Sequence, residues 1–440
     1  MMYLRKYFQQ AVILVASLLG ASAVASEWMW HGSFPWVYSD QNKEWNYWQV
    51  GRDGRFYKWS QSEGGWLIFN DGRASWETIN APELNLSRWG VWESDPKPYG
   101  GSFTLEKIKS CILSSETFLD LSYQMIEDLT PVGEATHLRK LYLQANQITN
   151  LEPLKSLKNL EVLYLGSNSV SDLSPLGSLL ELKELFLEDN ELKDTPLPAI
   201  LPLGVLTRLE QLDLSDNSLI NLEALSKLRS LEFLNLRGNL ITSVEELKLL
   251  TKIQKLDLAN NRLTNLFGLE NLSALNILYG EDNFIEDISN LGGLDNLKEL
   301  NLANNQVNSL GVFSQINNGR SYLWFADFSD NNLSDINGLE SINNLRILAL
   351  SNNKIDNLVP LSGMNELSTL LIDFNEVKDL SPIQDLPKLR GLYANNNQLA
   401  TDVSVTQFDQ LFEFYLFDNN LTESRKILIK QALPNVSLQL

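Results

Sequence analysis

Residues 138–168 read LRKLYLQANQITNLEPLKSLKNLEVLYLGSN, and this stretch decides the fold. Three leucines at alternating or near-alternating positions precede Asn146, and the same spacing precedes Asn168, 22 residues later. Thirteen asparagines continue this series with gaps of 22 residues, apart from gaps of 27 and 26: Asn146, Asn168, Asn190, Asn217, Asn239, Asn261, Asn283, Asn305, Asn331, Asn353, Asn375, Asn397 and Asn419. A fixed period of about 20 to 50 residues predicts a stacked solenoid.

One repeat shows how such a chain folds. Residues 140–144 alternate like a short strand, with Leu141 and Leu143 inward and Tyr142 outward. Asn146 lies where the chain must bend, and its amide can both donate and accept, so stacked asparagines can satisfy the backbone groups of neighbouring turns. The Leu-x-Pro-Leu return, at 151–154 and 173–176, predicts a tight or 3₁₀-like outer side rather than a long helix.

This pattern closely resembles the leucine-rich repeats of bacterial internalin-like proteins, over residues 116–421. The resemblance implies an α/β solenoid shaped as a horseshoe, with a parallel sheet on the concave face and protein recognition as the usual task. We expect about 13 repeats plus one incomplete unit, in which Gln124 replaces the asparagine. Gly280, Ala326 and Ala394 depart from the pattern, and insertions lie around 195–203 and 317–321.

The two ends carry other signals. Residues 1–25 have a basic start, an apolar run and an Ala-Val-Ala ending, so they predict an export signal peptide cut after Ala25; an uncleaved membrane anchor is the alternative. Residues 97–115 are expected to be a linker and a cap helix over the N-terminal end of the core. Its Cys111 is the only cysteine, either a buried cap residue or a reactive thiol.

Residues 422–440 predict a C-terminal cap. We expect a helix N-capped by Thr422 and running through Gln431, with Ile427, Leu428 and Leu433 on its apolar face, and then a closing strand.

Ten of the eleven tryptophans lie between Trp28 and Trp92, and the eleventh is Trp324. Residues 26–96 therefore predict a small all-β, aromatic-rich module with hairpin turns such as Asp53-Gly54. Its rings either fill its own core or bind a cell-envelope glycan on their flat faces. The candidate glycan-binding residues are Trp36, Trp45, Trp48, Trp59 and Trp66.

Signs of catalysis are few. His31 and His137 are the only histidines, and neither has a second ligand at metal-binding spacing, so we expect no cofactor and no metal site, although calcium on the acidic face is conceivable. The formal net charge of −20 disfavours nucleic acid and anionic lipid as partners. This charge serves either solubility or attraction to a basic partner.

Three outward residues per strand can be read by counting back two, four and six positions from each ladder asparagine. We call the position four residues back the central column. Aromatic and acidic residues gather there and beside it, and a solvent-facing strand surface needs no rings in order to fold. The candidate protein-binding residues are Tyr142, Tyr164, Phe186, Asp213, Phe233, Asp257, Tyr279, Phe325, Asp327, Tyr393, Tyr415 and Phe417. Packing between neighbouring rings that only stiffens the sheet is the alternative.

The sequence thus favours an exported, non-enzymatic protein that binds another protein on the concave face, with the tryptophan module as attachment or second binding site. The alternative is a carbohydrate- or cell-wall-binding protein in which that module is the main site and the solenoid is a spacer. A hydrolase within the module is the remaining hypothesis, and the shortage of histidine and paired acids disfavours it.

Overall fold

The computed structural model describes the backbone of residues 28–30, 36–39, 44–50, 56–60, 65–70 and 75–78, and the chain over residues 86–194, 197–315, 322–399, 408 and 410–440. Side chains are described from residue 88 onward. The predicted signal peptide lies outside the described residues. The chain divides into two compact units, Met1–Gly90 and Val91–Leu440.

The first unit contains a meander of antiparallel strands. Six strands are described, and each pairs with the next along the chain: β1 (Trp28–Trp30), β2 (Trp36–Ser39), β3 (Glu44–Val50), β4 (Phe56–Ser60), β5 (Gly65–Asn70) and β6 (Ser75–Thr78). The longest pairing joins β3 and β4, which flank the predicted Asp53-Gly54 turn. The expectation that residues 26–96 are all β is wrong at its end, because Leu86–Ser94 form the helix α2. Its Trp89 and Trp92 are both buried.

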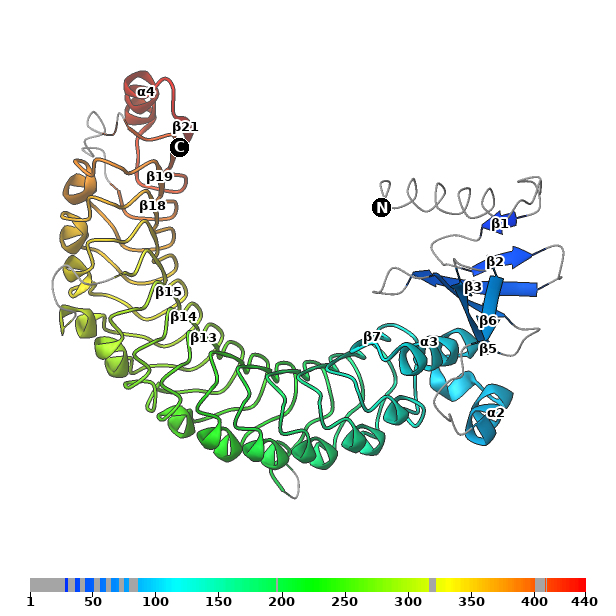
Figure 1. Cartoon of the computed structure of the whole chain (residues 1–440). Coiled ribbons are helices and arrows are strands. Elements are labelled where there is room, and N and C mark those ends of the chain that lie inside the picture. Colours follow the sequence, from blue (N-terminus) through cyan, green and yellow to red (C-terminus); the bar gives the residue numbers. More distant parts are fainter. Residues whose placement is uncertain are drawn as a thin grey trace. The chain divides into compact units, whose positions relative to one another are not determined.

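The second unit is a curved solenoid with strands on its inner side and short helical turns on its outer side (Figure 1). Its described strands form one parallel sheet in chain order: β7 (Phe118–Asp120), β8 (Lys140–Tyr142), β9 (Val162–Tyr164), β10 (Glu184–Phe186), β11 (Gln211–Asp213), β12 (Phe233–Asn235), β13 (Lys255–Asp257), β14 (Ile277–Tyr279), β15 (Glu299–Asn301), β16 (Phe325–Asp327), β17 (Ile347–Ala349), β18 (Thr369–Leu371), β19 (Gly391–Tyr393), β20 (Glu413–Tyr415) and β21 (Ser437–Gln439). The predicted horseshoe with a parallel sheet is confirmed.

The outer side consists of 3₁₀ turns. These are η2 (Val132–Glu134), η3 (Glu152–Ser156), η4 (Ser174–Ser178), η5 (Leu201–Val205), η6 (Glu223–Lys227), η7 (Glu245–Leu247), η8 (Ser289–Gly293), η9 (Gly311–Gln315), η10 (Leu339–Ser341), η11 (Val359–Leu361) and η12 (Ser381–Ile383), while η1 (Lys97–Tyr99) precedes the first repeat. The predicted Leu-x-Pro-Leu returns are η3 and η4, where proline occupies the first turn and needs no hydrogen-bond partner for its nitrogen. Between sheet and turns lies a core of leucines that are almost wholly buried, such as Leu141, Leu163 and Leu185.

The ladder asparagines connect successive repeats. Asn168 accepts the backbone N–H of Ile148 at 3.0 Å and donates to the carbonyl oxygens of Leu143 and Leu165 at 3.0 and 2.9 Å. Asn283 in the middle of the array does the same with Leu263, Leu258 and Gly280, at 3.0, 2.9 and 3.2 Å. The predicted role of the asparagines, satisfying the backbone of two adjacent turns, is confirmed.

The residue before each ladder asparagine has a left-handed backbone, which the sequence did not suggest. These positions hold varied residues, from Ala145 (φ 55°) to Phe374 (φ 55°), and include Gly238 (φ 67°). This conformation lets the backbone N–H of Ala145 reach the carbonyl oxygen of Gly166 in the next repeat at 2.8 Å. A bulky side chain there is strained.

Both ends of the solenoid are covered. Helix α3 (Ser102–Ser114) buries Leu105, Ile108 and Cys111, and burial raises the pKa of the Cys111 thiol to about 12. Cys111 is therefore the buried cap residue of the two predicted alternatives.

At the C-terminus, α4 (Glu423–Ala432) begins after Thr422, whose hydroxyl accepts the N–H of Arg425. Its predicted apolar face was partly wrong, because Ile427 and Leu428 are more than half exposed. Ile429 and Leu433 are the buried residues.

We expect Asn283→Ala to lower the free energy of unfolding by about 2–4 kcal/mol, because several buried backbone groups lose their partners at about 1–3 kcal/mol each. Urea unfolding followed by circular dichroism measures the loss, and hydrogen exchange at the Leu263 amide locates it. Asn365→Ala, at an exposed asparagine outside the ladder, is the matched control and should change stability by less than about 0.5 kcal/mol. An equal loss of unfolding free energy in the two variants would contradict the structural role of the ladder asparagines.

We expect Phe374→Gly to raise the free energy of unfolding by about 0.5–1 kcal/mol, because relief of left-handed strain exceeds the added entropy of glycine. The opposite change, Gly238→Ala, should destabilise, since its new Cβ would collide with the Asp216 carboxylate. Thermal unfolding of both variants checks the pair, and a loss of stability in Phe374→Gly would show that its ring contributes more than its backbone costs.

Candidate functional site

The predicted contact residues of the solenoid lie on the outward, concave face of the sheet. In β8, for example, Leu141 is buried in the core while Lys140 and Tyr142 face away from it. Parallel pairing in register places the central column in one continuous row, so that Tyr142 lies beside Tyr164 and Tyr164 beside Phe186. Side chains far apart in the sequence therefore form one surface.

An aromatic ladder covers the N-terminal end of this face. The Tyr142 and Tyr164 rings are stacked at 4.4 Å between centroids with an interplanar angle of 14°, and Phe186 follows at 4.3 Å from Tyr164. Phe118 packs edge-on against Tyr142 at 5.1 Å and is 40% exposed. Cross-strand ring packing, the alternative reading of these residues, is thus present, and it leaves the outer ring surfaces partly exposed.

Phe118 belongs to this ladder although the sequence did not single it out. It lies in the incomplete first unit, six residues before Gln124, which stands in place of the asparagine, so the same count from Gln124 would have found it. The signal was the alternation of Phe118, Leu119 and Asp120, which matches the first strand of a repeat.

The acidic members of the central column are largely occupied within the sheet. Each accepts the backbone N–H two residues later, at distances of 2.8–3.0 Å: Asp213 from Ser215, Asp257 from Ala259 and Asp327 from Ser329. Asn235 and Asn301 do the same with Arg237 and Ala303. This short side-chain cap is the preferred local hydrogen bond of Asp and Asn, and it explains why these two residue types recur in the column.

Of these aspartates, Asp213 makes the most hydrogen bonds within the sheet. It is only 9% exposed, its Oδ1 also accepts the Ser215 hydroxyl at 2.6 Å, and its Oδ2 accepts the Asn235 amide at 2.8 Å. Its carboxylate thus serves the sheet rather than an outside ligand.

The middle of the face pairs rings with a cation. The ammonium of Lys255 lies 5.5 Å from the ring centroids of both Phe233 and Tyr279, which flank it on neighbouring strands. The Tyr279 hydroxyl donates to Glu299 at 3.0 Å, and burial together with this carboxylate raises the pKa of Tyr279 to about 12.

At the C-terminal end, Tyr393 and Tyr415 pack edge to face at 5.0 Å, and the Tyr393 hydroxyl donates to Glu413. That hydrogen bond and burial raise the pKa of Tyr393 to about 12. Phe417 is more than half exposed beside them. Phe325, the remaining predicted contact residue, lies 5.9 Å from the Trp324 ring. The two ends of the face are thus aromatic, as predicted.

The Glu188 carboxylate, two residues after Phe186 of the aromatic ladder, lies in surroundings that disfavour its charge. A Cβ built at Gly166 would collide with its carboxylate, so the Glu188 side chain lies over the glycine of the neighbouring repeat. Its Oε2 is buried and has no hydrogen-bond partner among the described residues. Burial raises the pKa of Glu188, and nearby Asp213 raises it further.

The predicted glycan-binding tryptophans lie on described strands, but their side chains are outside the described part: Trp36 on β2, Trp45 and Trp48 on β3, Trp59 on β4 and Trp66 on β5. Within the described residues, no cluster of three or more histidines, cysteines or acids could hold a metal ion. None of the described helices has the length and apolar character needed to cross a bilayer.

Comparison with known proteins agrees with this geometry. A family model described as two copies of the leucine-rich repeat matches this chain at residues 136–178, 158–199 and 207–249. No curated protein matches the sequence.

Solved structures share the fold. An internalin of Listeria monocytogenes, InlF, is 23% identical with a TM-score of 0.65, over 78% of this chain and 96% of that one. A leucine-rich repeat protein of Leptospira interrogans is 24% identical with a TM-score of 0.60, over 82% and 100% of the two chains. A plant peptide hormone receptor, RGFR1, solved with RGF2, is 23% identical with a TM-score of 0.61, over 74% of this chain and 55% of that one. The resemblance to internalin-like repeats is confirmed at the level of the fold.

We expect Glu188→Gln to stabilise the protein at pH 7 by about 0.5 kcal/mol, because it removes a half-buried charge that has one unpartnered oxygen and that solvent screens in part. When folding raises the pKa of a carboxyl group, the free energy of unfolding of the protein falls as the pH rises above the unfolded pKa of about 4.3. The advantage of the glutamine should therefore shrink towards pH 4, where Glu188 is also neutral. Thermal unfolding between pH 4 and 8 measures it.

Glu161→Gln is the control. Hydrogen bonds from Lys183 and Arg139 lower the pKa of Glu161, so this variant should lose stability at pH 7. A gain from Glu188→Gln that is the same at every pH would contradict the assignment of a buried charge.

Proposed function

We propose that this leucine-rich repeat protein with an internalin-like fold is an exported, non-enzymatic recognition protein that binds another protein on its concave face. The observation that carries the proposal is the aromatic ladder of Phe118, Tyr142, Tyr164 and Phe186. These rings lie outside the leucine core, and the central column of the next three strands holds Asp213, Asn235 and Asp257 without loss of the fold. Large, partly exposed rings at the centre of a polar surface are the usual anchors of protein interfaces.

The ladder supports a protein partner better than a small molecule. It extends over four neighbouring strands, from β7 to β10, on an open face. Aromatic rings that are already stacked lose little side-chain freedom on binding, which lowers the cost of association. The solved complex of the plant peptide hormone receptor with RGF2 shows that a protein of this fold can hold a peptide ligand.

The charge of the chain favours a partner with a basic surface. The net charge is −20, and Glu184 and Glu188 stand at the outward positions on either side of Phe186 in the aromatic ladder. Complementary charge would raise the association rate and make binding sensitive to salt. In this proposal the capped aspartates of the central column, Asp213 above all, maintain the sheet, and the rings make the contacts.

Export and attachment complete the proposal. The basic and apolar pattern of residues 1–25 supports a cleaved signal peptide and a secreted or cell-surface location. The tryptophan-rich module would then be an attachment or second binding site, with a cell-envelope glycan as its candidate ligand.

We expect Tyr142→Ala combined with Tyr164→Ala to weaken binding of a protein partner by at least about thirtyfold, since each interface anchor contributes more than about 1 kcal/mol. The partner is first identified by a photo-crosslinking amino acid at position 164, with the same group at Val205, which is exposed on the outer side, as the background. Affinities of the purified pair are then measured by calorimetry.

The control is Val205→Ala combined with Val359→Ala, which removes two exposed side chains from the outer 3₁₀ turns. It should leave the affinity unchanged. Crosslinking that is equal at positions 164 and 205, or an unaltered affinity in the tyrosine double variant, would contradict recognition by the ladder.

A further inference from the structure

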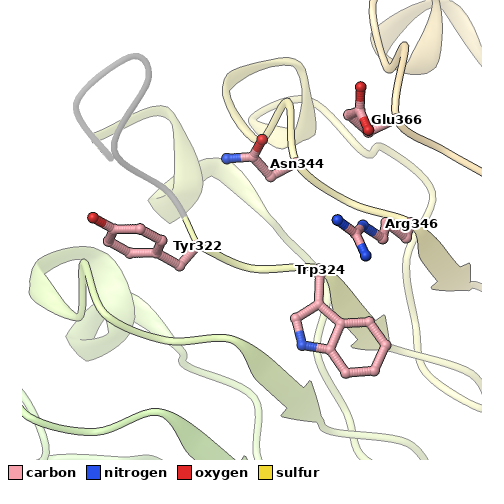
Figure 2. A pocket seen from close by; sticks show the side chains of 5 residues that line it. All are labelled: Tyr322, Trp324, Asn344, Arg346 and Glu366. Carbon is pink, nitrogen blue, oxygen red and sulfur yellow. The ribbon is translucent and has the colours of Figure 1, made fainter.

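A pocket of about 420 Å³ opens beside the concave columns described above, at the edge of the sheet where strands β16 and β17 begin. Tyr322, Trp324, Asn344, Arg346 and Glu366 line it (Figure 2). Trp324 and Arg346 stand directly before β16 and β17, seven residues before their ladder asparagines, and Tyr322 and Asn344 stand nine residues before them. We call these two positions the rim columns. The volume lies in the range of small-ligand sites.

The rings of this pocket are not required by the core. Tyr322 is 58% exposed and Trp324 is only partly buried. In the early repeats the position of Trp324 holds charged residues, Arg139, Glu161 and Lys183, in strands of the same geometry. Trp324 is also the only tryptophan after residue 92. A tryptophan placed at an exposed, charge-tolerant position requires a reason other than folding.

The charges of the rim columns differ between the two halves of the solenoid. Near the N-terminus they neutralise one another, because Glu161 pairs with both Arg139 and Lys183 at 2.7 Å. Around the pocket the positive charges are in excess. Both oxygens of Glu366 accept from Lys388 at 2.7 Å, and no salt bridge joins Arg346 to any described residue.

The excess extends along the same rim. From residue 296 to residue 412 its two columns contain four cations and one anion: Lys298, Arg346, Lys388 and Arg390, against Glu366. This positive strip is unusual in a chain with a net charge of −20. An anionic ligand would be attracted to it and repelled by most of the remaining surface.

We propose that the rim pocket binds an acidic saccharide, such as a chain that contains uronic acid. One sugar ring packs its apolar face on Trp324, and its carboxylate pairs with the planar guanidinium of Arg346, while Tyr322 offers a separate ring to the next sugar of the chain. Figure 2 shows Arg346 between the Trp324 ring and Glu366, so one ligand can reach all three. The Glu366 carboxylate accepts from Lys388 and keeps further lone pairs that can accept from a sugar hydroxyl. An acidic saccharide fits this set better than an acidic peptide, because each sugar ring combines an apolar face for Trp324 with hydroxyl donors and an anionic group in one rigid unit.

Calorimetry with the signal-cleaved chain tests the proposal, using oligogalacturonate as the probe and its methyl ester as the uncharged analogue with the same rings. We expect oligogalacturonate to bind at about 1 mM or below, and the ester to bind at least about tenfold more weakly. Trp324→Ala and Arg346→Gln should each weaken binding of the acid by at least about tenfold. Arg139→Gln is the control. It makes the same change of charge in the same rim column near the N-terminus, where Arg139 pairs with Glu161, and should leave the affinity unchanged.

Several results would overturn the proposal. Equal affinities for the acid and the ester would exclude an anion site, and full binding by both pocket variants would place the saccharide elsewhere, for example on the tryptophan-rich module. Binding of oligoglutamate with the same affinity and the same loss in Arg346→Gln would make the pocket a site for acidic peptides. No binding of oligogalacturonate at about 1 mM would also overturn it. Because Arg346 is exposed, Arg346→Gln keeps the test valid if Trp324→Ala unfolds.

Discussion

The hydrogen bonds of the ladder asparagines are the constraint on which the solenoid depends. Each repeat turns sharply after its strand, and this turn places backbone donors and acceptors inside the protein where water does not reach them. Asn261, for example, is nearly buried and joins the N–H of Ile241 to the carbonyl oxygens of Leu236 and Leu258. An unpaired group there would cost more than a single bond contributes, so the asparagine fixes both the turn and its distance to the previous repeat. The leucine core supplies most of the stability around this framework.

This framework leaves the outward side of the sheet free for other tasks, and the structure separates two of them. The aspartates and asparagines of the central column accept a backbone N–H two residues later, which makes them part of the strand itself. The rings do not have this role. They stack on each other at the N-terminal end, surround Lys255 in the middle and pair again at the C-terminal end. A face whose acids maintain the sheet and whose rings are partly exposed is suited to recognition through aromatic contacts.

The rim pocket adds a second surface with opposite character. The concave face lies in an acidic chain, whereas the rim around Trp324 and Arg346 carries excess positive charge. Trp324 directly precedes Phe325, and the two rings lie 5.9 Å apart, so an acidic saccharide at the rim would lie next to a protein held on the concave face. A protein that held both ligands would link a protein partner to a charged glycan.

The sequence by itself determined the repeat, the parallel sheet, the 3₁₀ outer side, both caps and the positions of the outward columns. It could do so because each of these follows from spacing within one repeat or between adjacent repeats. The left-handed residue before each asparagine was missed, since residues as different as Ala145 and Phe374 occupy it, and helix α2 was missed because the tryptophan count pointed to strands throughout. Only the tertiary structure decided what each outward side chain touches. It showed that the Asp213 carboxylate is hydrogen-bonded within the sheet, that Phe118 joins the aromatic ladder and that Trp324 and Arg346 line one pocket. Such contacts depend on which side chains the stacking of repeats brings together, and on which hydrogen bonds are already made, and neither is written in the spacing of one repeat.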